Sequence, residues 1–186
     1  MRDRSPLRLV LTAAAGLAVA PVHAQSPWTL VESTLRYRVS HPFHDTEGVS
    51  HDARGKAVCA SGTCDVLVAV PVKSFDSGDS NRDLHMIQAV RGAQFPLASV
   101  RLRVPESAEG SPEIRCDLTV EFAGQTAEYR QVAFHVATEG KRLRISGTIP
   151  ATLSDFKIPP PSLLAVAVKN EMPIQVDTVW AASPPH

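Results

Sequence analysis

Hydrophobic and polar residues alternate along most of the chain after residue 25. In TLRYRVSH, Leu35, Tyr37 and Val39 alternate with polar side chains, and in CDVLVAVPV the valines recur at every second position from Val66 to Val72. A period of two places one set of side chains on each face of an extended strand. Similar alternation recurs in VRLRV, EIRCDLTVEF, YRQVAFHVA, KRLRISGTI and MPIQVDTVW. The pattern therefore predicts an all-β protein.

The predicted strands number about eight, and short connections separate nearly all of them, which favours antiparallel neighbours. A sheet of eight strands protects its edges by closing into a barrel, and the interior of such a barrel is either filled by side chains or holds one small ligand. An open sandwich stays an alternative, because alternation alone does not distinguish a closed sheet from an open one.

The alternation also predicts which side chains face the inside of the barrel, although a slip of one residue would invert a strand. The residues that we place on the lumen or core side are Leu35, Tyr37, Val39, Val68, Val70, Leu102, Val120, Phe122, Phe134, Val136, Ile145, Ile174 and Val176.

One short amphipathic helix is predicted from Ser80 to about residue 91. Ser80 is a suitable N-cap with Asp83 three residues later, and Gly92 ends the apolar pattern. A helix between two barrel strands must cover apolar surface with its apolar side, so we expect it to lie at the barrel mouth as a lid.

The N-terminal 24 residues have the pattern of a bacterial secretory signal peptide. Arg2, Arg4 and Arg8 precede or begin a short apolar run that ends at Ala20, and cleavage is expected after Ala24. The run is short for a membrane span, and no later stretch reaches about 20 apolar residues. We therefore expect a single barrel domain at residues 25–186, exported to the periplasm and not integral to a membrane.

Export to an oxidising compartment affects the interpretation of the three cysteines. Cys59 and Cys64 flank ASGT, a stretch suited to a hairpin tip, and we predict a disulfide between them. Cys116 lies in an alternating strand and is expected to be a small buried side chain.

Charge and motifs exclude several functions. The 186 residues carry 19 basic and 19 acidic side chains, so there is no basic field for nucleic acid. The chain lacks G-x-S-x-G, a matched cysteine and histidine signature and a glycine-rich phosphate loop. We expect neither catalysis nor a cofactor.

Histidines provide the alternative hypothesis, a metal-binding or metal-dependent hydrolytic protein. His41, His44 and His51 fall within eleven residues, in what the sequence indicates is a connection between strands. We do not predict a metal site here, because histidines spread over a loop seldom form a preorganised set of ligands. The aspartates of SFDSGDSNRDLH match no metal motif and are better explained as turn and helix-cap residues.

The chain resembles the YceI-like family. The resemblance rests on Trp28, on YRVSH ending at His41, on VKSFDSGDSNRDLHM, on AQFPLASVRLR, and on SDFKI with the final NEMPIQVDTVWA. Where the family has a glycine between its fifth and sixth strands, this chain has Phe122, with glycine shifted to residue 124. We expect this extra aromatic ring to reshape the interior.

The resemblance implies an extended, lipocalin-like barrel that holds a polyprenyl-like or fatty amphiphile in its apolar lumen, without catalysis. A third interpretation makes the barrel a filled module beside a membrane redox partner. Whether two copies form a homodimer is left open by the sequence.

Overall fold

A computed structural model describes residues 26–163 and 166–182, and the expected signal peptide lies outside them. The elements, in chain order, are β1 (Ser26–His41), β2 (His44–Ser50), β3 (Arg54–Ala60), β4 (Thr63–Pro71), the 3₁₀ turn η1 (Val72–Ser74), α1 (Ser80–Ala89), β5 (Leu97–Pro105), η2 (Glu106–Gly110), β6 (Glu113–Phe122), β7 (Gln125–Glu139), β8 (Arg142–Ile149), η3 (Ser154–Phe156), β9 (Ser162–Leu163), β10 (Val166–Ala167) and β11 (Ile174–Ala182).

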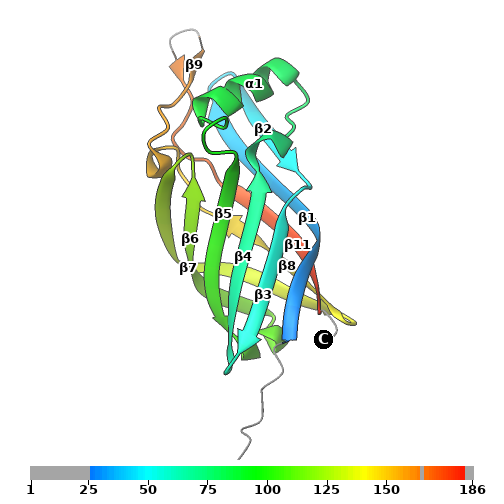
Figure 1. Ribbon diagram of the computed structural model, residues 1–186. Coiled ribbons are helices and arrows are strands. Elements are labelled where there is room, and N and C mark those ends of the chain that lie inside the picture. Colours follow the sequence, from blue (N-terminus) through cyan, green and yellow to red (C-terminus); the bar gives the residue numbers. More distant parts are fainter. Residues whose placement is uncertain (1–25, 164–165, 183–186) are drawn as a thin grey trace, which may run out of the picture.

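Eight antiparallel strands close into a barrel (Figure 1). The order around the barrel is β1, β3, β4, β5, β6, β7, β8 and β11, and β11 pairs again with β1. Each of these pairings is antiparallel. The predicted fold is confirmed, and closure explains why an alternating pattern recurs in every strand, since each strand has one face inside and one face outside.

β2 lies outside the set of eight barrel strands and corrects the sequence interpretation, which placed His44–Ser50 in a connection. The first residues of β1 pair with β3, whereas Leu35–His41 pair with β2. Arg38 with Asp45 and Arg36 with Glu47 form ion pairs across this hairpin. Its polar composition therefore reflects the solvent-facing side of a strand pair rather than a loop.

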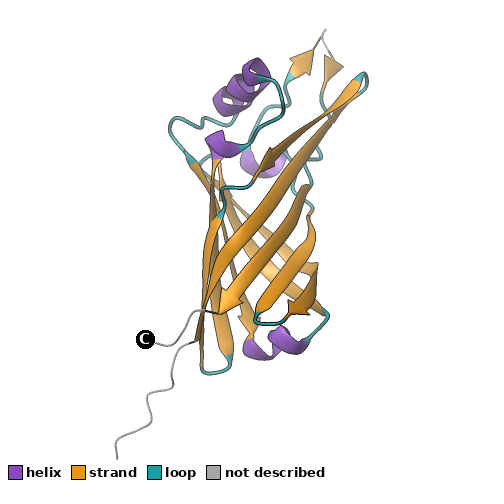
Figure 2. Cartoon of the chain, turned by 90° about the vertical axis from the view of Figure 1, so that its right-hand side faces the viewer, coloured by secondary structure: helices purple, strands orange, loops and turns teal. Residues whose placement is uncertain are grey.

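α1 lies over one end of the barrel, and the hairpin of β9 and β10 lies beside it at that same end, whereas η2 lies at the opposite end (Figures 1 and 2). The N-cap is Asp79 and not Ser80 as predicted: the Asp79 carboxylate accepts hydrogen bonds from the backbone amides of Asn81 and Arg82. Asp83 accepts from the Ser77 amide and hydroxyl, so the acidic stretch holds the turn and the start of the helix.

Within the described ranges, no helix has the length and the apolar character needed to cross a bilayer.

Candidate functional site

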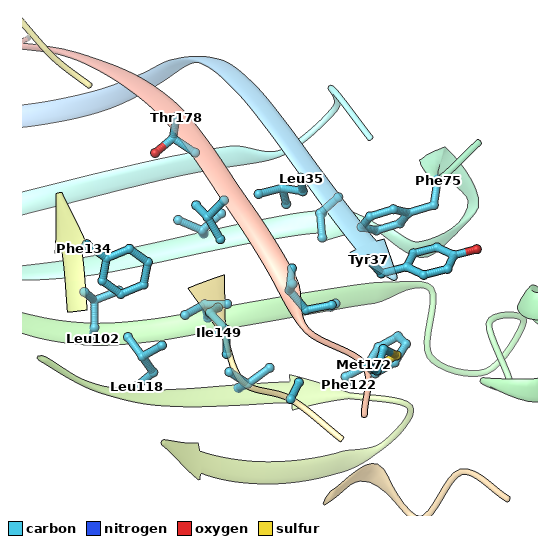
Figure 3. A pocket seen from close by; sticks show the side chains of 18 of the residues that line it. Leu35, Tyr37, Phe75, Leu102, Leu118, Phe122, Phe134, Ile149, Met172 and Thr178 are labelled. Carbon is cyan, nitrogen blue, oxygen red and sulfur yellow. The ribbon is translucent and has the colours of Figure 1, made fainter. Parts of the chain in front are cut away.

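An apolar cavity of about 500 Å³ occupies the inside of the barrel. Figure 3 shows side chains that surround it, among them Leu102 from β5, Leu118 from β6 and Phe134 from β7. The volume falls in the range of about 300–1,000 Å³ that is usual for small-molecule sites. The barrel is thus hollow, and its lining is mostly aliphatic and aromatic.

All thirteen side chains that the alternation places inside line this cavity. Their strand register explains the agreement: Leu35 lies opposite Val176, and Val136 lies opposite Ile145. Side chains at directly paired positions of antiparallel strands lie on the same face of the sheet. If one residue of a pair faces the cavity, its partner in the next strand does so too. Whether these residues contact a ligand stays a prediction.

Two glycines in the wall give aromatic rings room to pack flat against the sheet. A Cβ atom on Gly147 would lie 2.6 Å from Phe134 Cδ1, and a Cβ on Gly48 would overlap the Tyr37 ring. Rings that lie against the wall leave the middle of the barrel open. The Gly48 site belongs to β2, which therefore contributes to the cavity although it lies outside the eight-stranded barrel.

Residues 150–163 and 166–173 close part of the α1 end and supply lining residues that the sequence interpretation missed. They are Ala151, Leu153, Phe156, Ile158, Pro161, Val168 and Met172. The Phe156 ring is 1% exposed and meets the Phe122 ring edge to face, with centroids 5.3 Å apart. Phe122 is thus part of the cavity wall and packs against this segment.

A partly buried hydrogen bond fixes that segment to the barrel. Tyr129 Oη donates to Asp155 Oδ2 over 2.7 Å, and the Thr152 amide donates to the same oxygen over 2.8 Å. Burial raises the pKa of Asp155, but the hydrogen bonds from Tyr129 and Thr152 outweigh it and hold that pKa below its usual range. Burial and the neighbouring carboxylate raise the pKa of Tyr129. Asp155 therefore acts as an ionised anchor next to Phe156.

The α1 end of the cavity carries polar groups. Arg82, His85 and Met86 line it from the helix, and Tyr37 and Phe75 pack together there with ring centroids 5.6 Å apart. Burial raises the pKa of Tyr37, Asp83 raises it further, and Arg82 opposes the change. Both charged side chains are therefore near the Tyr37 phenol.

The opposite end is bounded by Trp28, Glu106 and Trp180. Trp180 Nε1 donates to Thr178 Oγ1 over 3.1 Å, and that hydroxyl donates to the Ile145 carbonyl over 3.1 Å. These polar atoms are therefore satisfied within the protein and leave the lining effectively apolar.

The cysteines are arranged as the sequence predicted. Cys59 and Cys64 lie opposite each other in β3 and β4 and form a disulfide, and Cys64 lines the cavity. Cys116 is free and buried, and burial raises the pKa of its thiol to about 11. A thiol of that pKa is mostly protonated at neutral pH, which fits a packing role.

The histidine hypothesis gains no support from the geometry. The rings of His41 and His44 lie 5.5 Å apart, but His51 is placed elsewhere, with Nδ1 3.0 Å from the Ser33 carbonyl oxygen and 3.2 Å from Thr34 Oγ1. Among the residues that the structure describes, no three histidine, cysteine, aspartate or glutamate side chains are placed to hold a metal ion.

A closed antiparallel barrel of eight strands around an apolar cavity defines a lipocalin-like fold. The chain belongs to the YceI-like family, because the model of the YceI-like domain matches residues 28–180. Sequence comparison with curated proteins gives no match.

Three solved structures share the fold. A polyisoprenoid-binding domain from Saccharophagus degradans, implicated in plant cell wall breakdown, superposes with a TM-score of 0.71 at 12% identity and covers 84% of this chain and 98% of its own. BcnA from Burkholderia cenocepacia has a TM-score of 0.67 at 17% identity, with 79% and 95% covered. A YceI protein from Campylobacter jejuni has a TM-score of 0.53 at 13% identity, with 99% of each chain covered.

Proposed function

We propose that this protein is a periplasmic carrier that binds a long-chain isoprenoid or other amphiphilic lipid inside the barrel, without catalysing a reaction. The observation that carries the proposal is the continuous apolar cavity of about 500 Å³. A polyisoprenoid is the ligand class named for the Saccharophagus degradans domain of the same fold. The export signal expected at residues 1–24 supports a periplasmic location.

Apolar burial alone is sufficient for binding of this kind. Enclosing about 400 Å² of hydrocarbon surface at about 25 cal/mol per Å² contributes roughly 10 kcal/mol. Association costs at least about 4 kcal/mol of translational and rotational freedom, and ordering a flexible chain costs more. The remainder, about 6 kcal/mol before the chain is ordered, corresponds to a dissociation constant of some tens of micromolar at best. Such binding requires no reacting group, which is why we propose a carrier and not an enzyme.

A pair of neighbouring substitutions in β4 tests the proposal. Val68 lines the cavity, whereas the adjacent Leu67 points outward and is 46% exposed. We expect Val68→Trp to fill the lumen and to weaken binding of a fluorescent polyene fatty acid by about tenfold or more, which corresponds to about 1.4 kcal/mol.

Leu67→Trp is the matched control, because it adds the same ring on the other face of the same strand. It should bind the probe as the parent protein does. Both variants are first checked for an unchanged circular dichroism spectrum. Failure of the parent protein to bind the probe, or equal binding by all three proteins, would refute the proposed function.

A further inference from the structure

The ionisable groups that line the cavity are distributed unequally between its two ends. Among the described residues, the lining side chains that can carry charge near neutral pH are Arg82 and His85 on α1 and Glu106 on η2. Figures 1 and 2 show that α1 and η2 lie at opposite ends of the barrel. One end therefore offers hydrogen-bond donors and the other a carboxylate.

We propose that the lipid binds in one orientation, with an acceptor oxygen of its head group held by Arg82 and His85 and its tail directed toward η2. This inference rests on the proposed function and adds the chemical class and position of the head group.

Arg82 is held in place by neutral partners. Its Nε donates to Ser77 Oγ over 2.9 Å and its Nη2 donates to the Ser77 carbonyl over 2.8 Å. The ion pairs found within the described residues all involve other arginines. A guanidinium has five N–H donors, so the two bonds to Ser77 fix its position and leave donors for a ligand.

The nearby carboxylates are engaged with the protein. Asp79 caps the helix through the amides of Asn81 and Arg82, and Asp83 accepts from Ser77. They reduce the net positive charge around Arg82 without forming an ion pair with it. The site is therefore suited to a single acceptor oxygen, either of a carbonyl or of a carboxylate, rather than to a highly charged head group.

His85 lies one helical turn after Arg82, so both side chains lie on the same side of α1. His85 and Ala89 line the cavity and are also exposed to solvent. The cavity therefore reaches solvent along this side of the helix. A head group held there would remain hydrated while its tail is buried, which avoids the cost of burying a polar group.

The opposite end is unsuited to such a head group. The Glu106 carboxylate is an acceptor when ionised and would repel an acceptor oxygen. The Thr178 hydroxyl, deeper in the lumen, already donates to Ile145 and accepts from Trp180. An apolar tail can bind at this end, because it needs no hydrogen-bond partners.

The test compares three ligands of similar length: palmitic acid, methyl palmitate and hexadecane. Each displaces diphenylhexatriene, a neutral fluorescent hydrocarbon, from the protein. For the parent protein, at least one of the two oxygenated ligands should bind about tenfold more tightly than hexadecane, as expected for a hydrogen bond to a charged donor. Tighter binding of palmitic acid indicates a preference for a carboxylate head group, and tighter binding of methyl palmitate indicates a preference for a neutral carbonyl.

Arg82→Gln should reduce this preference to about twofold or less while hexadecane binds as before, and His85→Gln should reduce it partly. Arg82→Lys, which retains the charge, should retain part of it. Glu106→Gln, at the other end, removes a repelling carboxylate and no donor to the head group, and should not reduce the preference. Uptake of diphenylhexatriene by each variant shows that it is folded.

The inference is overturned if the parent protein shows no preference, if Arg82→Gln leaves the preference intact, or if Glu106→Gln alone removes it. In these cases hexadecane still binds and the proposed function stands. Absence of any binding of diphenylhexatriene or hexadecane to the parent protein would overturn the proposed function together with the inference.

Discussion

The hydrogen bond between Tyr129 and Asp155 should contribute measurably to stability in a pH-dependent way. Tyr129→Phe removes the donor and leaves Asp155 with its bonds to Thr152. Hydrogen bonds to charged groups contribute about 1.5–3 kcal/mol, and we expect the lower end because Asp155 is half-buried. The free energy of unfolding should therefore fall by about 1.5 kcal/mol at pH 7.

The pH dependence follows from the direction of the Asp155 pKa. Because the folded-state pKa lies below the unfolded value of about 3.9, ionised Asp155 stabilises the fold above that pH. The contribution is lost as the pH falls through the folded-state pKa. The difference between the parent protein and Tyr129→Phe should therefore shrink in acid.

Urea unfolding at pH 7 and pH 3 measures both effects. A double-mutant cycle with Asp155→Asn isolates the pairwise term, which should be about 1–2 kcal/mol at pH 7. A coupling energy near zero at pH 7, or a difference that grows toward acid, would show that the Tyr129 bond does not anchor the segment.

Two further predictions concern the helix cap and the disulfide. Asp79→Ala should lower the free energy of unfolding, measured in urea, by about 1 kcal/mol, whereas Ser80→Ala should change it by about 0.5 kcal/mol or less. The reverse order would show that Ser80 is the N-cap. Replacing Cys59 and Cys64 by alanine removes a cross-link between residues five positions apart. The unfolded chain gains entropy, so the free energy of unfolding should fall by about 2 kcal/mol. Equal unfolding midpoints for the parent protein and the double variant would contradict that estimate.

The side chains that face the inside of the barrel were predictable, because the alternation within each strand shows which of its residues share a face. Val68, Phe134 and Val176 belong to different strands, and each was placed inside by alternation with its immediate neighbours alone. A bulge in β7, where Arg130 and Gln131 lie opposite the single residue Asp117 of β6, did not disturb the assignment of Phe134, because alternation resumes at Val132.

The missed parts lack local periodicity. The segment that contains Phe156 and Met172 has few regular elements, so its contribution to the cavity arises from tertiary packing that no local pattern encodes. β2 was missed because its composition is polar, and its strand geometry depends on cross-strand partners in β1. The N-cap was misplaced by one residue because adjacent Asp79 and Ser80 are both favourable cap residues.

We propose that the barrel encloses a lipid in the cell. Mass spectrometry of the organic extract of protein purified from its native cells without detergent tests this directly. We expect one apolar or amphiphilic molecule per protein chain, released by solvent and absent from Val68→Trp prepared in the same way. Repeated extracts without such a molecule, from protein that is folded and monodisperse, would contradict it.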